Sequence, residues 1–447
     1  MQALMSRGYK IAGAKCGPDY IDPMFHRKIL GVESENLDLF FCEPQVMRGL
    51  FAEHASEADI TLIEGVMGYY DGMAIDSEKG SSYEVAKVLD APVLLVIDAK
   101  GAALSVLAVL KGFLTFRDDN NIAGILLNRV SGAVYPRMKE MVEQGLEDMG
   151  HPVPVVGYVP ENPLFRLKSR HLGLVTPQEI KNLKSVFEEI GTVLSETVDL
   201  EQILKIAGRV PLLEPSAGEV SLKRQIMPPE RAEHGKIRLA VARDLAFGFY
   251  YKDNLRLLEK LGCELAPFSP LKDRGLPPDI SGLLLGGGYP ELYAEELSAN
   301  TSLIKEIRTM LEQGLPCHAE CGGFMYLHEA MEGSDHKFYD MVGFIGGKAI
   351  QRERLVRFGY IQIEGNRDGV YLEQGEVLRG HEFHYWDSQN NGDDCVARKP
   401  GRDISWNCIH MRGNVFAGFP HIHYYSNMRF AQRFVNRMKE YLPDRCE

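Results

Sequence analysis

Short apolar runs alternate with longer helical patterns along this chain, and this alternation most constrains its fold. In the first half each apolar run is bounded by Gly, Pro, Asp or Asn, and amphipathic stretches such as 136–149 lie between the runs. Near-continuous apolar strands separated by amphipathic helices predict an α/β fold, a parallel sheet covered on both faces. The expected strands are 9–15, 59–64, 92–98, 122–128 and 153–159.

The pattern stops and then restarts, which predicts two domains. Residues 208–236 carry four prolines among mixed charges, and we interpret them as an interdomain linker. The chain of 447 residues then divides into a first domain, 1–207, and a second domain, 237–447. The strands expected in the second domain are 237–242, 263–268, 280–285 and 315–320, followed after about residue 344 by closely spaced strands that include antiparallel pairs.

Charge and hydropathy exclude several classes of partner. The net charge is −12, from 50 basic and 62 acidic residues, whereas a nucleic-acid-binding protein needs a basic face. The longest apolar run, 91–99, is too short to span a membrane, and the first residues are too polar for a signal peptide. We therefore expect a cytoplasmic protein with neither nucleic acid nor membrane as a partner.

Cys321 has the strongest local signature of a catalytic residue. An apolar strand runs into it, and Gly322 and Gly323 follow before a helical pattern begins. A strand–turn–helix of this kind exposes the central side chain at a helix N-terminus, where the thiolate is favoured. A buried structural cysteine is the alternative, and it suits Cys317, which lies inside the strand.

Two further segments could complete such a site. Gly286, Gly287 and Gly288 end a predicted strand, where their N–H groups could form an oxyanion hole, although a plain tight turn is equally compatible. His421 and His423 would lie on one face if their segment is a strand. One could then act as the general base and the other could orient it; a pair of interior histidines is the alternative.

These segments together resemble a class I glutamine amidotransferase, more narrowly the branch of the cobyrinate a,c-diamide synthase and cobyric acid synthase families. The resemblance lies in residues 242–251, 268–271, 286–291, 319–323 and 380–385. It implies a flavodoxin-like domain in which Cys321 attacks glutamine, His421 is its base, and Gly287, Gly288 and Gly322 form the oxyanion hole. Most triad amidotransferases carry an acidic residue two positions after this histidine, where this chain, like its branch, has His423.

The first domain carries carboxylates at the ends of two predicted strands. Lys15, Asp19, Tyr20 and Asp22 follow the first strand; Glu64 ends the next one, and its glycine-punctuated loop reaches Asp71. An acid that ends a central strand can hold magnesium beside a nucleotide, so we expect Glu64 and Asp22 to be metal ligands. Aspartate-rich turns are the alternative for each loop alone.

Both loops, together with residues 126–129 and 170–174, resemble the synthetase domain of the same family, a dethiobiotin-synthetase-like relative of the P-loop NTPases. The resemblance implies an ATP or substrate site with Lys15, Asp19, Tyr20, Asp22, Asp71 and Asn128, the last near the nucleotide base. The family's domain begins with a strand, a Gly-x-x-x-x-Gly-Lys-Thr loop and a helix that leads into Arg-Gly-Tyr-Lys. This chain begins inside that helix, with Arg7 to Lys10, so we expect a truncated domain with an apolar sheet edge or gap.

The resemblance implies amidation of the a and c carboxylates of cobyrinate, or of a close tetrapyrrole, in cobalamin biosynthesis. ATP with Mg²⁺ would form an acyl phosphate, and glutamine would supply the ammonia. A nickel-sirohydrochlorin a,c-diamide synthase and a cobyric acid synthase are two alternatives of similar architecture. A third is a truncated tetrapyrrole-binding protein with glutaminase activity only. An open sheet edge also allows a homodimer.

Overall fold

The computed structural model of the chain describes residues 1–166, 169–170, 173–174, 182–210 and 237–441. The chain divides into two compact units. Unit 1 comprises Met1–Leu39 and Pro44–Glu219, and unit 2 comprises Phe40–Glu43 and Val220–Glu447. Most of the predicted linker, 208–236, lies outside the described residues, so its limits stay a prediction.

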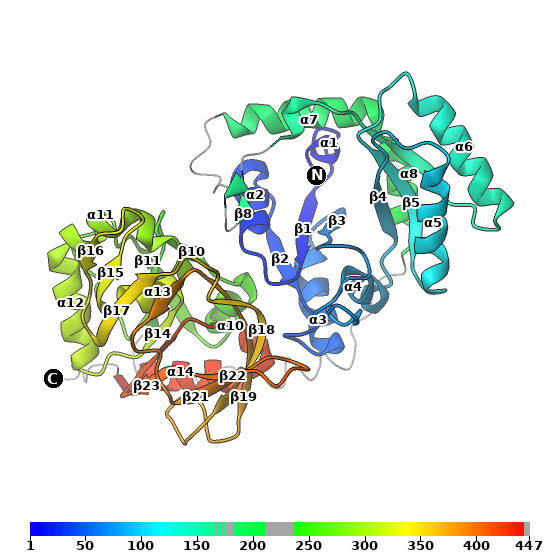
Figure 1. Cartoon of the computed structure of the whole chain (residues 1–447). Helices are drawn as coiled ribbons and strands as arrows, with labels where there is room; N and C mark the ends of the chain where they lie inside the picture. Colours follow the sequence, from blue (N-terminus) through cyan, green and yellow to red (C-terminus); the bar gives the residue numbers. More distant parts are fainter. Residues whose placement is uncertain (167–168, 171–172, 175–181, 211–236, 442–447) are drawn as a thin grey trace. The chain divides into compact units, whose positions relative to one another are not determined.

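The strands of unit 1 form where the apolar runs predicted them (Figure 1). The strand Ile122–Asn128 (β5) has its predicted bounds, and the other four begin one or two residues later than expected. One short strand, Ser34–Leu37 (β2), was not predicted because its sequence, Ser-Glu-Asn-Leu, is mostly polar. The remaining strands are β1 (Ile11–Cys16), β3 (Ile60–Glu64), β4 (Val93–Asp98), β6 (Val155–Val159), β7 (Ser169–Arg170) and β8 (Gly173–Leu174).

Helices alternate with these strands as the periodicity predicted. The chain opens in a four-residue helix, α1 (Gln2–Met5), and the predicted helix 136–149 is observed as α6 (Tyr135–Asp148). The other helices of unit 1 are α2 (Ile21–Leu30), α3 (Pro44–Ala55), α4 (Ser82–Leu89), α5 (Ser105–Phe116), η1 (Pro163–Phe165), α7 (Leu183–Thr197) and α8 (Leu200–Ala207).

The parallel strands of unit 1 form two three-stranded sheets, so the predicted parallel sheet has a gap in its hydrogen bonding. The strand orders are β2-β1-β3 and β4-β5-β6, and among the described residues no strand pairs with the outer edge of β3 or of β4. Side-chain packing joins the sheets instead, since Leu62 of β3 and Leu126 of β5 share an apolar cluster with Leu4 of α1. The open edges are apolar, as predicted; Val96 of β4 is 55% exposed.

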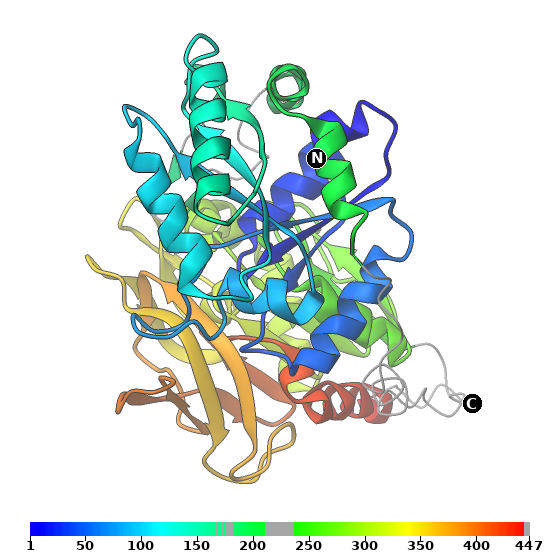
Figure 2. The ribbon, with the colours of Figure 1, turned by 90° about the vertical axis from the view of Figure 1, so that its right-hand side faces the viewer.

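Helices cover both faces of the sheet β4-β5-β6. Ile125 and Leu127 of β5 pack in one cluster with residues of α5 and α6, whereas Leu126 packs in another cluster with residues of α8. Successive side chains of a strand point to opposite faces, so each face of β5 has its own helical layer. The adjacent helices α5 and α6 are the cyan pair in Figure 2.

Unit 2 contains a six-stranded sheet in the order β11-β9-β12-β14-β24-β23. Its first five strands are parallel and follow the order 2-1-3-4-5, which is flavodoxin-like as predicted. The strands are β9 (Ile237–Ala242), β11 (Cys263–Phe268), β12 (Gly282–Leu285), β14 (Cys317–Glu320), β23 (His410–Arg412) and β24 (Val415–Gly418). The helices of this unit are α10 (Lys252–Lys260), η2 (Pro290–Tyr293), α11 (Ala294–Ala299), α12 (Thr301–Glu312), α13 (Gly322–Tyr326), η3 (Tyr424–Ser426) and α14 (Met428–Tyr441).

The later strands of unit 2 include antiparallel pairs, as predicted. They form a four-stranded sheet, β16-β15-β17-β20, and a five-stranded antiparallel sheet, β22-β21-β18-β19-β25, while β10 and β13 pair separately. Their bounds are β10 (Phe247–Phe249), β13 (Gly287–Gly288), β15 (His328–Glu332), β16 (Phe338–Asp340), β17 (Ile345–Gln351), β18 (Arg357–Gly365), β19 (Val377–His384), β20 (Trp386–Ser388), β21 (Cys395–Arg398), β22 (Ser405–Cys408) and β25 (His421–Ile422). None of the described helices is long and apolar enough to cross a membrane.

Candidate functional site

Cys321 occupies the sharp turn between β14 and α13 that the sequence predicted. Its φ is +48° and its ψ is −104°, a conformation that non-glycine residues rarely adopt. Its N–H donates to Gly418 O at 2.8 Å and its carbonyl accepts from Met325 N at 2.9 Å, so hydrogen bonds hold the turn on both sides. The strained backbone presents the thiol at the carboxyl end of the central sheet, where parallel sheets bind ligands.

The glycines after Cys321 are required by close packing. A Cβ atom at Gly323 would lie 2.1 Å from Leu285 O, and a Cβ atom at Gly322 would lie 3.3 Å from Gly288 N. The elbow and the turn after β12 are therefore in direct backbone contact, which brings the three predicted oxyanion-hole glycines to Cys321. Their N–H groups as oxyanion donors stay a prediction.

His421 lies against the same turn. A Cβ atom at Gly287 would lie 2.4 Å from His421 Cε1, and β25 pairs His421 with His381 of β19. Burial alone would lower the pKa of His421, but the charge of Cys321, its hydrogen bond and the Glu320 carboxylate outweigh burial and raise this pKa to about 10. The protonated form of His421 is therefore favoured beside Cys321, as a nucleophile–base pair requires.

His423 lies in a different environment from the one its spacing predicted. The strand β25 ends at Ile422, so His421 and His423 do not share a strand face. The His423 ring stacks on Phe41, with centroids 5.2 Å apart and an interplanar angle of 6°, and its Nδ1 lies 3.6 Å from Cys42 Sγ. Burial lowers the pKa of His423 to about 3, so the ring is neutral. Its predicted role as the orienting group is not supported by these contacts.

Glu320 is the carboxylate that the structure places beside His421, and sequence reasoning missed it. Its Oε2 lies 3.8 Å from His421 Nδ1, and its Oε1 accepts from Ile422 N at 3.0 Å. The residue is 5% exposed. Its position immediately before Cys321 was the available signal. Adjacent residues of a strand ordinarily point to opposite faces, so Glu320 was not expected beside the site of Cys321, but the unusual turn at Cys321 changes this arrangement.

Cys317 behaves as the structural alternative to Cys321. Its side chain is fully buried in the core of unit 2, and burial raises the pKa of its thiol well above the usual value.

His381 and His384, to which the sequence assigned no role, lie on β19. His381 accepts or donates a 2.8 Å hydrogen bond with Tyr251 Oη, whereas His384 stacks on Phe419.

The structure brings Lys15, Asp22 and Glu64 of unit 1 together. The Lys15 Nζ lies 2.7 Å from Asp22 Oδ2, 3.0 Å from Glu64 Oε1 and 3.0 Å from Gly65 O. These three acceptors use all three hydrogens of the ammonium group. Lys15 is therefore the counter-ion of two carboxylates in this arrangement, and its expected place in an ATP or substrate site stays a prediction. His26, missed by sequence reasoning although it lies one turn from Asp22 on α2, contacts Glu64 Oε2 at 3.2 Å.

The pKa values of Asp22 and Glu64 are shifted in opposite directions. Burial, together with the charges of Asp19 and Glu64, raises the pKa of Asp22 to about 6. Burial would also raise the pKa of Glu64, but hydrogen bonds from His26 and Lys15 outweigh it and lower this pKa to about 2. Burial lowers the pKa of Lys15, and the two carboxylates more than reverse this effect, so the pKa is raised.

Magnesium, which the sequence implied, fits this pair. Mg²⁺ is commonly held by one or two carboxylates together with phosphate oxygens. Asp22 and Glu64 share the single ammonium group of Lys15, and Asp19 adds negative charge near Asp22, so a divalent cation would offset an excess of negative charge. Within the described ranges no group of three or more His, Cys, Asp or Glu side chains is arranged to hold a metal. Further ligands would therefore have to come from water or phosphate.

The other predicted residues of unit 1 have contacts of their own. Asp19 Oδ1 accepts from Ile21 N at 2.7 Å and so caps α2, and Tyr20 beside it is buried. Asp71 Oδ2 accepts from Gly68 N at 2.9 Å within its own loop, as the turn alternative proposed. Asn128 ends β5 opposite Asp98. Of the basic segment 170–174, His171 lies outside the described residues.

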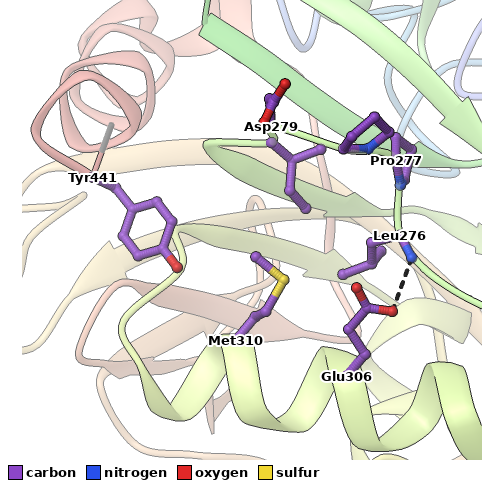
Figure 3. A pocket seen from close by; sticks show the side chains of 8 residues that line it. Leu276, Pro277, Asp279, Glu306, Met310 and Tyr441 are labelled. Atoms are coloured by element: carbon purple, nitrogen blue, oxygen red, sulfur yellow. Dashed lines mark hydrogen bonds between the residues drawn. The ribbon is translucent and has the colours of Figure 1, made fainter. Parts of the chain in front are cut away.

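The pocket in Figure 3 is separate from these residues. Ile280, which precedes β12, lines it, whereas Cys321 follows the carboxyl end of the parallel strand β14. The pocket thus lies at the amino ends of the parallel strands, whereas the thiol lies at their carboxyl ends. The hydrogen bond drawn in it is donated by Leu276 N to Glu306 Oε2 at 3.1 Å. Its lining consists of Leu276, Pro277, Pro278, Asp279, Ile280, Glu306, Met310 and Tyr441.

Comparisons with known proteins assign a domain to each half of the chain. The profile described as a CobB/CobQ-like glutamine amidotransferase domain matches residues 238–428, and that of an AAA domain matches residues 39–168. The solved structure of PurLQS from Thermotoga maritima is 17% identical, with a TM-score of 0.32, over 46% of this chain and 100% of that one. The profile match to residues 238–428 makes the second half of the chain a CobB/CobQ-like glutamine amidotransferase domain.

Whole-length relatives identify the family. The cobyrinate a,c-diamide synthase of Caldanaerobacter subterraneus subsp. tengcongensis is 36% identical over 444 residues, which cover 99% of this chain and 94% of the relative. The cobyrinate a,c-diamide synthase of Clostridium tetani is 37% identical over 441 residues, which cover 98% and 95%. The chain belongs to the cobyrinate a,c-diamide synthase family, and it is an amidating ligase of cobalamin biosynthesis that takes nitrogen from glutamine.

Proposed function

We propose that this chain converts the a and c carboxylates of cobyrinate, or of a close tetrapyrrole precursor, to amides with ammonia from glutamine and energy from ATP. The observation that carries the glutamine half is the strained Cys321 elbow beside the raised-pKa imidazole of His421. Membership of the cobyrinate a,c-diamide synthase family supports the acceptor.

In the glutaminase half, the Cys321 thiolate attacks the amide carbon of glutamine. The N–H groups of Gly287, Gly288 and Gly322 would stabilise the developing oxyanion. The carbon–nitrogen bond breaks as His421 gives its proton to the leaving nitrogen, so ammonia departs and a thioester remains. His421 then takes a proton from water, whose oxygen attacks the thioester, and glutamate leaves while the thiolate is restored.

In the ligase half, an oxygen of the acceptor carboxylate attacks the γ-phosphorus of ATP, which yields an acyl phosphate and ADP. Ammonia attacks the acyl carbon, inorganic phosphate leaves, and a proton is lost to give the amide. Mg²⁺, when bound, would neutralise charge on the phosphates during transfer. Asp22 and Glu64 would hold this ion, and Lys15 would keep their carboxylates in place.

A labelling experiment tests the proposal. The chain is incubated with ATP, Mg²⁺ and glutamine labelled with ¹⁵N at the amide, in parallel with cobyrinate and with nickel sirohydrochlorin, and the products are analysed by mass spectrometry. We expect two labelled amides on the a and c side chains of cobyrinate. Labelled amides on the nickel macrocycle alone, or on carboxylates other than a and c, would assign the chain to an alternative ligase. Glutamate release without any labelled tetrapyrrole would leave only the glutaminase.

Substitution of the two cysteines tests the glutaminase half separately. The variant Cys321→Ala should lose glutamine hydrolysis by about 10⁴-fold or more, because the nucleophile is removed. The matched variant Cys317→Ala, at the start of the strand that leads into Cys321, should keep it, since its thiol is buried and protonated. Retained hydrolysis in the first variant would disprove the assignment of the nucleophile.

A further inference from the structure

The two carboxylate oxygens of Glu320 have different surroundings. Oε1 accepts from Ile422 N at 3.0 Å and lies 3.3 Å from His318 Nε2. The His318 ring is itself fixed, because its Nδ1 lies 2.7 Å from Tyr424 Oη. One oxygen is therefore anchored to β25 and to its own strand, β14, and the other, Oε2, faces His421 Nδ1 at 3.8 Å.

We propose that Glu320 is the positioning carboxylate of the glutaminase site, which orients His421 through Nδ1 and stabilises its protonated form. This inference rests on the proposed Cys321–His421 chemistry. A base that exchanges protons with a nucleophile needs a third group to fix its tautomer and ring orientation. With Nδ1–H directed to Glu320, Nε2 is the nitrogen that exchanges the proton with ammonia and water.

The present separation of 3.8 Å exceeds a hydrogen bond, which needs about 3.2 Å or less for N–H and O. Catalytic hydrogen bonds are often long before substrate binds and shorten in the reacting complex. The side chain of Glu320 is 7% exposed and that of His421 is 3% exposed, so water screens their interaction little.

The other titratable groups around His421 do not supply this negative charge. His381 of β19 stacks on the His421 ring with centroids 4.9 Å apart, and burial lowers the pKa of His381 well below its usual value, so it is neutral. Burial also lowers the pKa of His318 on β14. Cys321 is the nucleophile, so any negative charge on its sulfur is consumed in the reaction. Glu320 is thus the negative group at His421 that persists through the cycle.

The test measures glutamine hydrolysis by the full chain as a function of pH. The variant Glu320→Gln keeps the shape and removes the charge, and we expect kcat to fall about 100-fold while the KM for glutamine changes by less than about threefold. Loss of the carboxylate lowers the pKa of His421, so the alkaline limb of kcat/KM should move to lower pH. Glu320→Asp, which keeps the charge on a shorter arm, should recover part of kcat.

The matched control is Glu382→Gln. Glu382 is an equally buried carboxylate beside a histidine, His384, at 3.4 Å, but on β19. This variant should leave the alkaline limb in place. A second readout is the rate of alkylation of Cys321 by iodoacetamide as a function of pH, because ionisation of the Cys321–His421 pair governs that rate. The rate measured for Cys321→Ala is subtracted to remove alkylation of other cysteines.

The outcomes separate the inference from the function on which it rests. Near-normal kcat in Glu320→Gln, or a fall in kcat with unchanged pH limbs for hydrolysis and alkylation, overturns the role of Glu320. If Glu320→Gln does not fold, Glu320→Asp decides, since a fall in kcat of about 100-fold in that variant with unmoved alkaline limbs for hydrolysis and alkylation would show a structural role only and overturn the inference. Hydrolysis that persists in Cys321→Ala would instead overturn the glutaminase site itself.

Discussion

Gly323→Ala should damage the elbow although it adds only one methyl group. The new Cβ would lie 2.1 Å from Leu285 O, whereas ordinary contact begins at 3.4 Å. Leu285 cannot retreat easily, because β12 is hydrogen-bonded between β9 and β14 in the middle of the sheet. The elbow must therefore move by about 1.3 Å relative to the turn after β12.

The magnitude follows from two opposing contributions. Overpacking of a tight site costs about 3 kcal/mol, and replacing glycine by alanine in the helix α13 returns about 1 kcal/mol. We expect unit 2 to lose about 2 kcal/mol, which moves the urea midpoint by about 1 M. A displacement of about 1 Å at the nucleophile should also lower kcat for glutamine hydrolysis about 100-fold.

Tryptophan fluorescence is a suitable assay because both tryptophans, Trp386 and Trp406, belong to unit 2. Gly346→Ala is the matched control, since nothing lies within 4 Å of a Cβ atom at that glycine of β17. The control should change stability by less than about 0.5 kcal/mol. Equal midpoints and equal hydrolysis in the two variants would refute the argument from backbone contact.

Three further predictions concern other elements. Lys15→Met leaves two carboxylates without their counter-ion and should destabilise unit 1 by about 2 kcal/mol, a figure that allows for the exposure of Glu64. The control Lys10→Met, at an exposed lysine, should cost under about 0.5 kcal/mol, and equal unfolding curves of the two variants by circular dichroism would contradict this. Phe41→Ala should lower the fluorescence-detected transition of unit 2 by about 3 kcal/mol, and an unchanged transition would contradict its packing there. The pKa of His423 is about 3 in the folded protein, below its value in the unfolded chain, so the free energy of unfolding should fall as the pH falls from about 6.5 toward 3, by up to about 1.4 kcal/mol per pH unit. His423→Gln should reduce this slope by the equivalent of one proton, which urea titrations at several pH values would measure.

Local pattern was sufficient for much of this fold and for the nucleophile. The strand Ile122–Asn128 follows from an apolar run between breakers, and the elbow follows from a strand that meets Cys321 and two glycines. Such features depend on neighbours a few residues apart, so the sequence contains their whole cause. The carboxylates Asp22 and Glu64 were also predicted to meet, because parallel strands end at the same edge.

Long-range packing decided the rest. Nothing in the sequence indicates that Phe41, between two elements of unit 1, belongs to unit 2 and stacks on His423, because that contact joins residues 382 positions apart. The spacing of His421 and His423 suggested a shared face, and only the end of β25 at Ile422 separates them. The sequence by itself determined which residues can do chemistry, since reactivity and local turns are properties of nearby groups. The tertiary structure decided that Glu320, and not His423, is the group beside His421, since that choice depends on how β14, β19 and β25 meet.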